Sequence, residues 1–218
     1  MKLGSGFGSI ANDGVKVFAG ASAPWGELLS SCAQLGLSGL ERMAGIPGTV
    51  GGGVFGNAGA FGASIGDKIE WVEGMNALGI EERLAAPDIG FGYRRASFPP
   101  NFVLTRVALS LQAGERETLL ATMDEIMARR REKQPLEFPS AGSVFKNPCQ
   151  AKAARLIEEA GLKGRRVGGA VVSEKHANFI VNAGGATARD ILTLIDIVRE
   201  EVLRRFSVSL ELEVKVVK

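Results

Sequence analysis

The chain has 218 residues, of which 26 are basic and 24 acidic, so its formal net charge at pH 7 is only +2. This near balance gives neither the basic surface typical of nucleic-acid binding nor an acidic tail. Its two cysteines, Cys32 and Cys149, make no disulfide framework. No apolar run reaches the length of a membrane span, and no signal-peptide h-region opens the chain. We therefore expect a cytoplasmic protein that binds neither membranes nor nucleic acid.

The first half of the chain reads as one α+β unit. Residues 15–21 predict a short buried strand, and residues 68–75 and 103–111 alternate apolar and polar side chains as half-buried strands do. Pro24 suits the first turn of a helix that ends before Gly36. Its apolar face consists of four residues at helical spacing: Trp25, Leu28, Leu29 and Cys32. This position makes Cys32 a core residue rather than a thiol nucleophile.

A glycine-rich stretch, residues 39–67, interrupts these elements and carries nine glycines between Gly45 and Gly66. Glycine at this density weakens helices and strands, and it lets backbone N–H groups approach a ligand closely. A phosphate or a flat polar ring suits such a surface. Neither a P-loop lysine nor a G-x-G-x-x-G motif in a βαβ setting is present. The alternative is a loop in which the glycines serve packing alone.

The second half predicts three helices and three strands. Residues 115–134 form an amphipathic helix that ends at Pro135, and its basic end, residues 129–131, complements the helix dipole rather than clamping a phosphate. Further helices are predicted over residues 151–160 and 188–205, the last with Thr187 and Asp190 as a capping box. Strands are predicted at three places: residues 169–172, 177–182 and 207–217.

Four blocks of this sequence resemble one enzyme family. They are AGIPGTVGGGVFGNAGAFG at 44–62, FGYRRASF at 91–98, PSAGSVFKNP at 139–148, and the tail LKGRRVGGAVVSEKHANFIVN…FSVSLELEV. In this order they are similar to the UDP-N-acetylenolpyruvoylglucosamine reductases, the MurB family of peptidoglycan synthesis, in its shorter form. The resemblance covers roughly residues 15–217, and four ordered blocks are far more specific than one.

The resemblance implies an α+β fold of the MurB and vanillyl-alcohol-oxidase-like flavoprotein type. Residues 1–111 then form the remainder of an FAD-binding domain, residues 112–200 a substrate-binding domain, and residues 201–218 a helix end and closing strand that carries Glu213. Residues 2–10 are similar to the linker strand that follows the family's first βαβ subdomain, whose pyrophosphate-binding loop has no counterpart here. We therefore expect this chain to bind FAD weakly. We also expect it to be a monomer.

The implied activity is that of UDP-N-acetylmuramate dehydrogenase, which reduces UDP-N-acetylglucosamine enolpyruvate with NADPH through FAD. No side chain donates hydride, so a cofactor must. By resemblance Ser143 is the general acid, Glu213 the catalytic carboxylate and Arg94 the cation that faces developing charge. Glu211 and Glu213 share a face if the closing strand is regular. Each has an ordinary alternative: a serine in a turn, a carboxylate on a solvated strand, a surface arginine.

The family's binding residues map onto two sets of positions. The cofactor set is Ile46, Pro47, Gly48, Thr49, Gly51, Gly52, Asn57 and Gly59, and the substrate set is Tyr93, Lys146, Asn147, Lys163 and His176. Lysines suit a diphosphate, and an asparagine amide suits a uracil edge or a sugar hydroxyl. His176 is the only histidine, which argues against a metal site built from histidines, and it could equally be a structural residue.

Three functions remain open at this point. The first is a working FAD-dependent and NADPH-dependent reductase. The second is a flavin-poor, inactive chain that only binds the UDP-sugar. The third is another flavoprotein of the same wider fold that acts on an unrelated alcohol, and Ser143 within its full motif argues against it.

Overall fold

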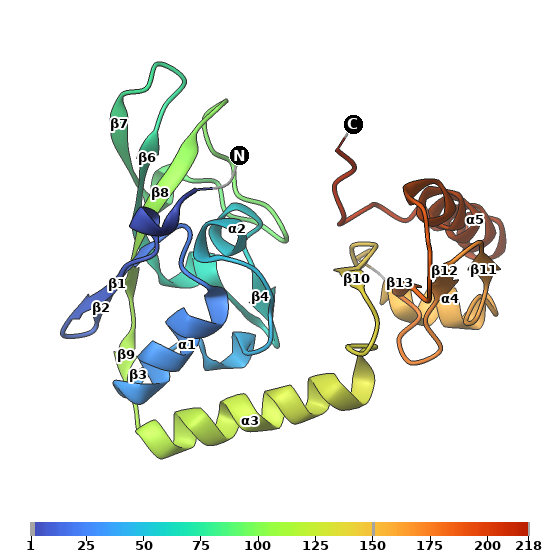
Figure 1. Ribbon diagram of the computed structural model, residues 1–218, viewed down its shortest axis with the longest axis horizontal. Coiled ribbons are helices and arrows are strands. Elements are labelled where there is room, and N and C mark those ends of the chain that lie inside the picture. Colours follow the sequence, from blue (N-terminus) through green and yellow to red (C-terminus); the bar gives the residue numbers. More distant parts are fainter. Residues whose placement is uncertain (1–2, 150, 218) are drawn as a thin grey trace. The chain divides into compact units, whose positions relative to one another are not determined.

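The computed structural model describes residues 3–149 and 151–217, and the chain forms two compact units, residues 1–128 and 129–218 (Figure 1). Both units mix helices with antiparallel strands, which confirms the predicted α+β class. None of the helices in the described ranges is long and apolar enough to cross a bilayer.

The first unit is built on a five-stranded antiparallel sheet of order β1-β2-β8-β6-β7. Its strands are β1 (Ile10–Asp13), β2 (Lys16–Gly20), β6 (Ile69–Met75), β7 (Glu81–Ala85) and β8 (Val103–Ser110). The strands predicted at 15–21, 68–75 and 103–111 are confirmed as β2, β6 and β8. The two edge strands, β1 and β7, are mostly exposed and carry no buried residue, so their sequences lack the apolar alternation that identified the others.

Helix α1 (Trp25–Gln34) packs its predicted apolar face into the core of this unit, together with α2 (Val50–Phe55). Cys32 lies in that core with 2% of its surface exposed, and burial raises the pKa of its thiol to about 12. Short elements complete the unit: η1 (Ser5–Phe7), β3 (Leu37–Ser38), η2 (Glu41–Met43), β4 (Gly59–Ala60), β5 (Ala63–Ser64), η3 (Ile65–Lys68), η4 (Ala86–Asp88) and β9 (Gln112–Ala113). Residues 2–10, expected as a linker strand, instead carry η1 in their described part and reach a strand only at Ile10.

The glycine-rich stretch contains a helix that its composition argued against. Gly51, Gly52 and Gly53 lie inside α2. A Cβ on Gly53 would come within 2.4 Å of the Trp25 ring, and one on Gly51 within 2.9 Å of the Ala21 Cβ. These two glycines let α2 pack closely against its neighbours, and that packing outweighs the low helix propensity of glycine. At positions 51 and 53 glycine is therefore required by packing.

Helix α3 (Arg116–Lys133) confirms the predicted helix. The boundary along the chain between the two units falls within this helix, after Ala128. Ile126 is buried in the core of the first unit, and Met123 and Met127 pack against that core. The division predicted at residue 111 therefore differs from the structure, in which the first unit extends to Ala128. These three apolar residues of the helix pack in the core of the first unit. The change of sequence pattern after residue 111 could not reveal this contact.

The second unit holds a four-stranded antiparallel sheet of order β10-β13-β12-β11 and two helices. Its elements are β10 (Ser140–Ser143), α4 (Ala153–Glu159), β11 (Arg166–Val167), β12 (Ala170–Val172), β13 (Phe179–Asn182) and α5 (Ala188–Phe206). The helices predicted at 151–160 and 188–205 are confirmed. The capping box of α5 is formed as predicted, because Asp190 N donates to Thr187 Oγ1 at 3.1 Å and Thr187 N donates to Asp190 Oδ2 at 2.9 Å.

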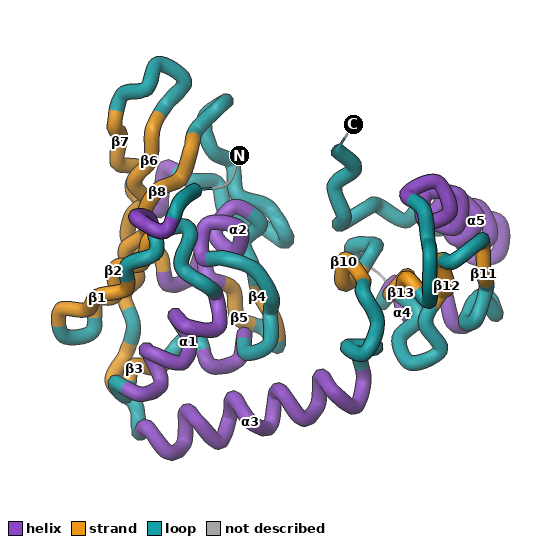
Figure 2. Tube along the Cα trace, in the orientation of Figure 1, coloured by secondary structure: helices purple, strands orange, loops and turns teal. Residues whose placement is uncertain are grey.

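The prediction of a strand over residues 207–217 is wrong, because the described part of this segment is a loop (Figure 2). This closing segment makes a single antiparallel bridge between Leu212 and Phe145, with Lys146 N donating to Glu211 O and Glu213 N donating to Val144 O, both at 2.8 Å. Leu210 is buried in the second core, so the segment belongs to that unit and forms no separate part. The alternation of apolar and polar residues in this segment accompanies the burial of Leu210. Within the described residues, the segment pairs with residues 144–146 alone, which is too short a stretch for a regular strand pair.

Candidate active site

The first unit carries a cleft of about 1080 Å³. Its lining combines residues of the glycine-rich stretch with several apolar side chains. Three small hydroxyl side chains reach it, those of Ser5, Ser22 and Thr49. The remaining lining residues are Leu3, Gly4, Ala21, Gly51, Gly52, Phe55, Phe102, Val103 and Leu104. A cleft with exposed backbone, hydroxyls and flat apolar walls can accept a ring system that bears polar substituents.

The predicted cofactor residues separate into three groups in this structure. Thr49, Gly51 and Gly52 line the cleft. Pro47 and Gly48 are exposed in the turn before α2, where Gly48 has a φ of +108°, and Ile46 packs against the core. Asn57 and Gly59 are buried: a Cβ on Gly59 would come within 2.5 Å of Ala63 O.

Gly52 differs from the glycines beside it. A Cβ there would meet only Thr49 Oγ1, at 3.6 Å, whereas Gly51 and Gly53 face closely packed neighbours. Gly52 is exposed and lines the cleft, and its N–H donates to Thr49 Oγ1 at 3.3 Å. The protein therefore does not need glycine at position 52 for its own packing, because a Cβ there would find open space beside Thr49 Oγ1.

Asn57 connects the glycine-rich stretch to the turn that carries Arg94. Its Nδ2 donates to Gly92 O at 2.9 Å, and its Oδ1 accepts from Gly66 N at 2.9 Å. Gly92 and Arg95 close the turn through two backbone hydrogen bonds, Gly92 N to Arg95 O at 2.8 Å and Arg95 N to Gly92 O at 3.1 Å. Both polar ends of the Asn57 side chain thus hold backbone, which explains why it is buried.

Arg94 occupies the left-handed region, with φ of +53°. This conformation is unfavourable for a long side chain and persists only where the surroundings impose it. The guanidinium lies 5.4 Å from the centre of the Tyr93 ring, a cation–π distance, and the Tyr93 side chain is exposed. The closed turn thus presents both predicted residues from one short segment.

The second unit places Ser143 at the end of β10, half-buried and paired across the sheet with Phe179. The regular ladder stops there, and the chain continues through Val144 and Phe145, which are both buried. Val144 N donates to Asn178 O at 2.9 Å on one side, and Val144 O accepts from Glu213 N on the other. The backbone of Glu213 is therefore anchored at the residue that follows Ser143.

Lys146 and Asn147 follow directly. The Lys146 ammonium forms an ion pair with Glu211, whose side chain is mostly exposed. Asn147 Oδ1 accepts from Ala153 N at 3.0 Å, at the start of α4, so its carbonyl end supports that helix. Glu211 therefore contacts the substrate-set lysine, while Glu213 holds the segment beside Ser143.

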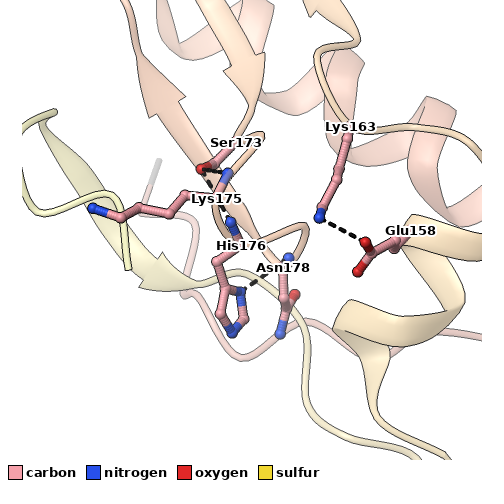
Figure 3. A network of polar contacts seen from close by, with 6 residues as sticks. All are labelled: Glu158, Lys163, Ser173, Lys175, His176 and Asn178. Atoms are coloured by element: carbon pink, nitrogen blue, oxygen red, sulfur yellow. Dashed lines mark hydrogen bonds and ion pairs between the residues drawn. The ribbon is translucent and has the colours of Figure 1, made fainter. Parts of the chain in front are cut away.

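Lys163 and His176 lie in one polar cluster with Glu158, Ser173 and Asn178 (Figure 3). Lys163 Nζ pairs with a Glu158 carboxylate oxygen at 2.7 Å. The buried Ser173 hydroxyl accepts hydrogen bonds from the backbone N–H groups of Lys175 and His176, at 3.1 and 3.3 Å. The turn that carries His176 is thus fixed by its own side chains.

His176 accepts a hydrogen bond from Asn178 N through Nδ1, at 3.3 Å, which places the proton of the neutral ring on Nε2. Its ring lies edge-on to Phe179, with centroids 4.8 Å apart. Burial lowers the pKa of the imidazole, and the positive charge of Lys163 adds to this effect. His176 is therefore a neutral donor at pH 7, held in orientation by the backbone.

This lowered pKa predicts a pH-dependent stability. The unfolded chain binds a proton at His176 near the ordinary pKa of 6.5, whereas the folded protein resists protonation. The His176 contribution to the free energy of unfolding is complete above 6.5 and is lost as pH falls toward the lowered value. Urea unfolding between pH 8 and 5 should show the stability advantage over His176→Gln narrowing below pH 6.5. A constant difference across this range would contradict the prediction.

Three residues of this cluster escaped the sequence analysis, namely Glu158, Ser173 and Asn178. Ser173 and Asn178 lie within the fourth family block, but the resemblance assigns neither of them a role, and Glu158 lies outside that block. Ser173 and Asn178 are buried, at 5% and 4% exposure, and buried polar side chains must be hydrogen-bonded. For Ser173 and Asn178 the available signal was their closeness in sequence to His176.

The first-unit cleft fits the flavin that the resemblance implies. The space at Gly52 is one that a Cβ would fill, and the lining alternates backbone, hydroxyl and aromatic groups. Thr49, Gly51 and Gly52 are the residues that would hold it. No group of three or more His, Cys, Asp or Glu side chains is arranged to bind a metal within residues 3–149 and 151–217.

Comparison with known proteins gives concordant results. Residues 134–217 match the family profile described as UDP-N-acetylenolpyruvoylglucosamine reductase, C-terminal domain. The chain is 47% identical over 217 residues to UDP-N-acetylenolpyruvoylglucosamine reductase 2 of Symbiobacterium thermophilum, an alignment that covers 99% of this chain and 70% of the relative. It is 46% identical over 205 residues to the reductase of Thermotoga maritima, with 93% of this chain and 72% of the relative covered.

A solved structure is also similar. The crystal structure of UDP-N-acetylenolpyruvylglucosamine reductase (MurB) from Thermus caldophilus superposes with a TM-score of 0.85 at 39% sequence identity. The match covers 98% of this chain and 76% of that one. The resemblance therefore extends to the fold over nearly the whole chain.

Proposed function

Because the chain belongs to the UDP-N-acetylenolpyruvoylglucosamine reductase family, we propose that it reduces the enolpyruvyl double bond of UDP-N-acetylglucosamine enolpyruvate in peptidoglycan synthesis, with FAD and NADPH. The observation that supports the proposal is the pairing of the closing segment with residues 144–146, which places the backbone of Glu213 beside Val144, next to Ser143, and the Glu211 carboxylate on Lys146. The product would be UDP-N-acetylmuramate, made in the cytoplasm by a monomer.

The chemistry divides between the cofactor and the side chains. Reduced FAD, when bound, would supply the hydride that adds to one carbon of the double bond. The Ser143 hydroxyl would give its proton to the other carbon, which is strongly basic once it is electron-rich. Glu213, whose backbone holds Val144, would handle the proton that Ser143 must regain, and Arg94 would stabilise the negative charge between the two transfers.

The polar cluster of the second unit supplies donors for a sugar nucleotide. Lys146 forms an ion pair with Glu211, and Lys163 forms one with Glu158. A diphosphate would compete with these carboxylates for the two ammonium groups. His176 offers its Nε2–H because Nδ1 is already an acceptor. Asn147 would act through its amide, and Tyr93 from the turn in the first unit.

A second candidate is a chain that binds the UDP-sugar but holds FAD weakly. The visible flavin absorption of the purified protein decides between the two. Protein that retains stoichiometric FAD through gel filtration supports the reductase, and colourless protein that still binds the UDP-sugar supports the second candidate.

The substrate site can be tested without flavin. With UDP-N-acetylglucosamine at about 100 times its Kd, the native state should gain about 2.7 kcal/mol. For a chain of this size that corresponds to a rise in Tm of roughly 5–10 °C. Lys163→Gln should reduce the rise, and Lys133→Gln, an exposed lysine at the end of α3, should leave it unchanged. A Tm that does not move at millimolar ligand would remove the proposed site.

A further inference from the structure

Asn178 is a buried side chain to which neither the motifs nor the proposed chemistry assigns a role. Its Oδ1 accepts from Phe145 N at 3.0 Å, and its Nδ2 donates to Phe145 O at 2.8 Å. The amide therefore holds both backbone groups of one residue, as a neighbouring strand would. The Asn178 main chain adds two contacts, since its carbonyl accepts from Val144 N and its N–H donates to His176 Nδ1.

This clamp lies where the sheet can no longer hold the chain. Strands β10 and β13 pair at Ser140 with Val181 and at Ser143 with Phe179, and their register shifts in between. Beyond Ser143 the ladder ends, and the side-chain amide of Asn178 takes over on that edge. The closing segment holds the opposite edge at Val144 and Lys146. The clamped residue, Phe145, stands between the predicted acid, Ser143, and the predicted diphosphate ligand, Lys146.

We propose that Asn178 is a positioning residue, which fixes the backbone of residues 144–146 so that Ser143 and Lys146 are presented together. The inference rests on the proposed function, because it assigns Asn178 to the same site. Asn178 acts through Phe145 and does not touch the substrate. Since a misplacement of about 1 Å at a reacting group can slow a reaction about a hundredfold, a clamp of this kind has a measurable effect.

Two substitutions separate the hydrogen bonds from the volume of the side chain. Asn178→Ala removes both bonds, whereas Asn178→Asp keeps the shape but sets a carboxylate oxygen against Phe145 O in place of a donor. Asn182→Ala is the matched control, because its Oδ1 also accepts two backbone N–H groups, those of Gly184 and Ala186, in a loop away from Phe145. All three variants are made in the full chain.

Two readouts apply to each variant. The first is amide hydrogen exchange, which needs neither flavin nor turnover: both Asn178 variants should exchange Val144, Phe145 and Lys146 about tenfold faster than the parent, and Asn182→Ala should not. The second uses flavin-loaded protein, in which both Asn178 variants should slow substrate reduction about a hundredfold while flavin reduction by NADPH stays at the parental rate.

Several results would overturn the proposal. Parental exchange in both Asn178 variants would do so, as would faster exchange with parental substrate reduction, or equal losses in Asn182→Ala. If neither variant folds, rapid exchange of the Phe145 amide in the parent contradicts the clamp, and slow exchange supports it. If Ser143→Ala turns over at the parental rate, the proposed role of Ser143 fails, while the exchange result for Asn178 stands independently.

Discussion

Ser143→Ala is expected to slow reduction of the enolpyruvyl substrate by about 10²- to 10⁴-fold, the contribution usual for a positioned general acid. The hydroxyl is half-buried at the end of β10, beside the segment held by Asn178 and Glu213, and no water in bulk solvent would be equally well oriented. Flavin reduction by NADPH should keep its parental rate, because it needs no proton from Ser143. Stopped-flow measurement of the two half-reactions tests both statements.

Ser140→Ala is the control for this experiment. Ser140 lies on the same strand and is exposed, and the hydrogen bond that its side chain makes within the described residues is a long local one, from Gly142 N to its Oγ at 3.5 Å. It should change neither half-reaction. Near-parental substrate reduction in Ser143→Ala would remove this residue from the mechanism.

Gly52→Ala and Gly53→Ala, neighbours in α2, are expected to act in opposite ways on stability. A methyl group added at position 52 would meet only Thr49 Oγ1, so Gly52→Ala should stabilise the flavin-free protein by about 0.5–1 kcal/mol through helix propensity. A methyl group added at position 53 would overlap the Trp25 ring, so Gly53→Ala should cost about 1–3 kcal/mol. Urea unfolding of the flavin-free chains measures both values.

The same pair tests the cleft. Because Gly52 lines the cleft and its Cβ side is open, a methyl group there should weaken FAD binding even as the protein gains stability. Titration of each variant with FAD, followed by flavin fluorescence, gives the affinity. If Gly52→Ala binds FAD as the parent does, the flavin does not approach this face of α2.

Local patterns predicted the elements that bury an apolar face. Trp25, Leu28, Leu29 and Cys32 defined α1, and Thr187 with Asp190 defined the start of α5, because both signals lie within a few neighbouring residues. The strand predicted for the closing segment, residues 207–217, is absent because a local pattern does not show whether a strand has a partner. Its alternation is real, but a strand also needs a partner of sufficient length, and β10 ends at Ser143.

The site was predictable only where a motif preserved it. Ser143, Lys146 and Glu213 were identified by resemblance, and the structure brings their segments together through backbone hydrogen bonds. Asn178 lies within the fourth family block, but the resemblance gave it no role, because that role depends on a contact with Phe145, 33 residues away. The glycines of α2 show the same limit. Helix propensity depends on the residue type alone, whereas glycine is needed at position 53 because the ring of Trp25, which is distant in sequence, leaves no room for a Cβ.

Residues 144–146 are held on one side by Asn178 and on the other by the closing segment, and these two sets of contacts form at different times during synthesis. Asn178 is 33 residues from Phe145, but Glu211 is 65 residues from Lys146, so the ribosome has made α4, the sheet and α5 before the second edge emerges. Longer loops cost only slightly more entropy to close, so the delay comes from the order of translation rather than from chain entropy. The surroundings of Ser143 are thus completed last, together with the core contacts that Leu210 adds to the second unit.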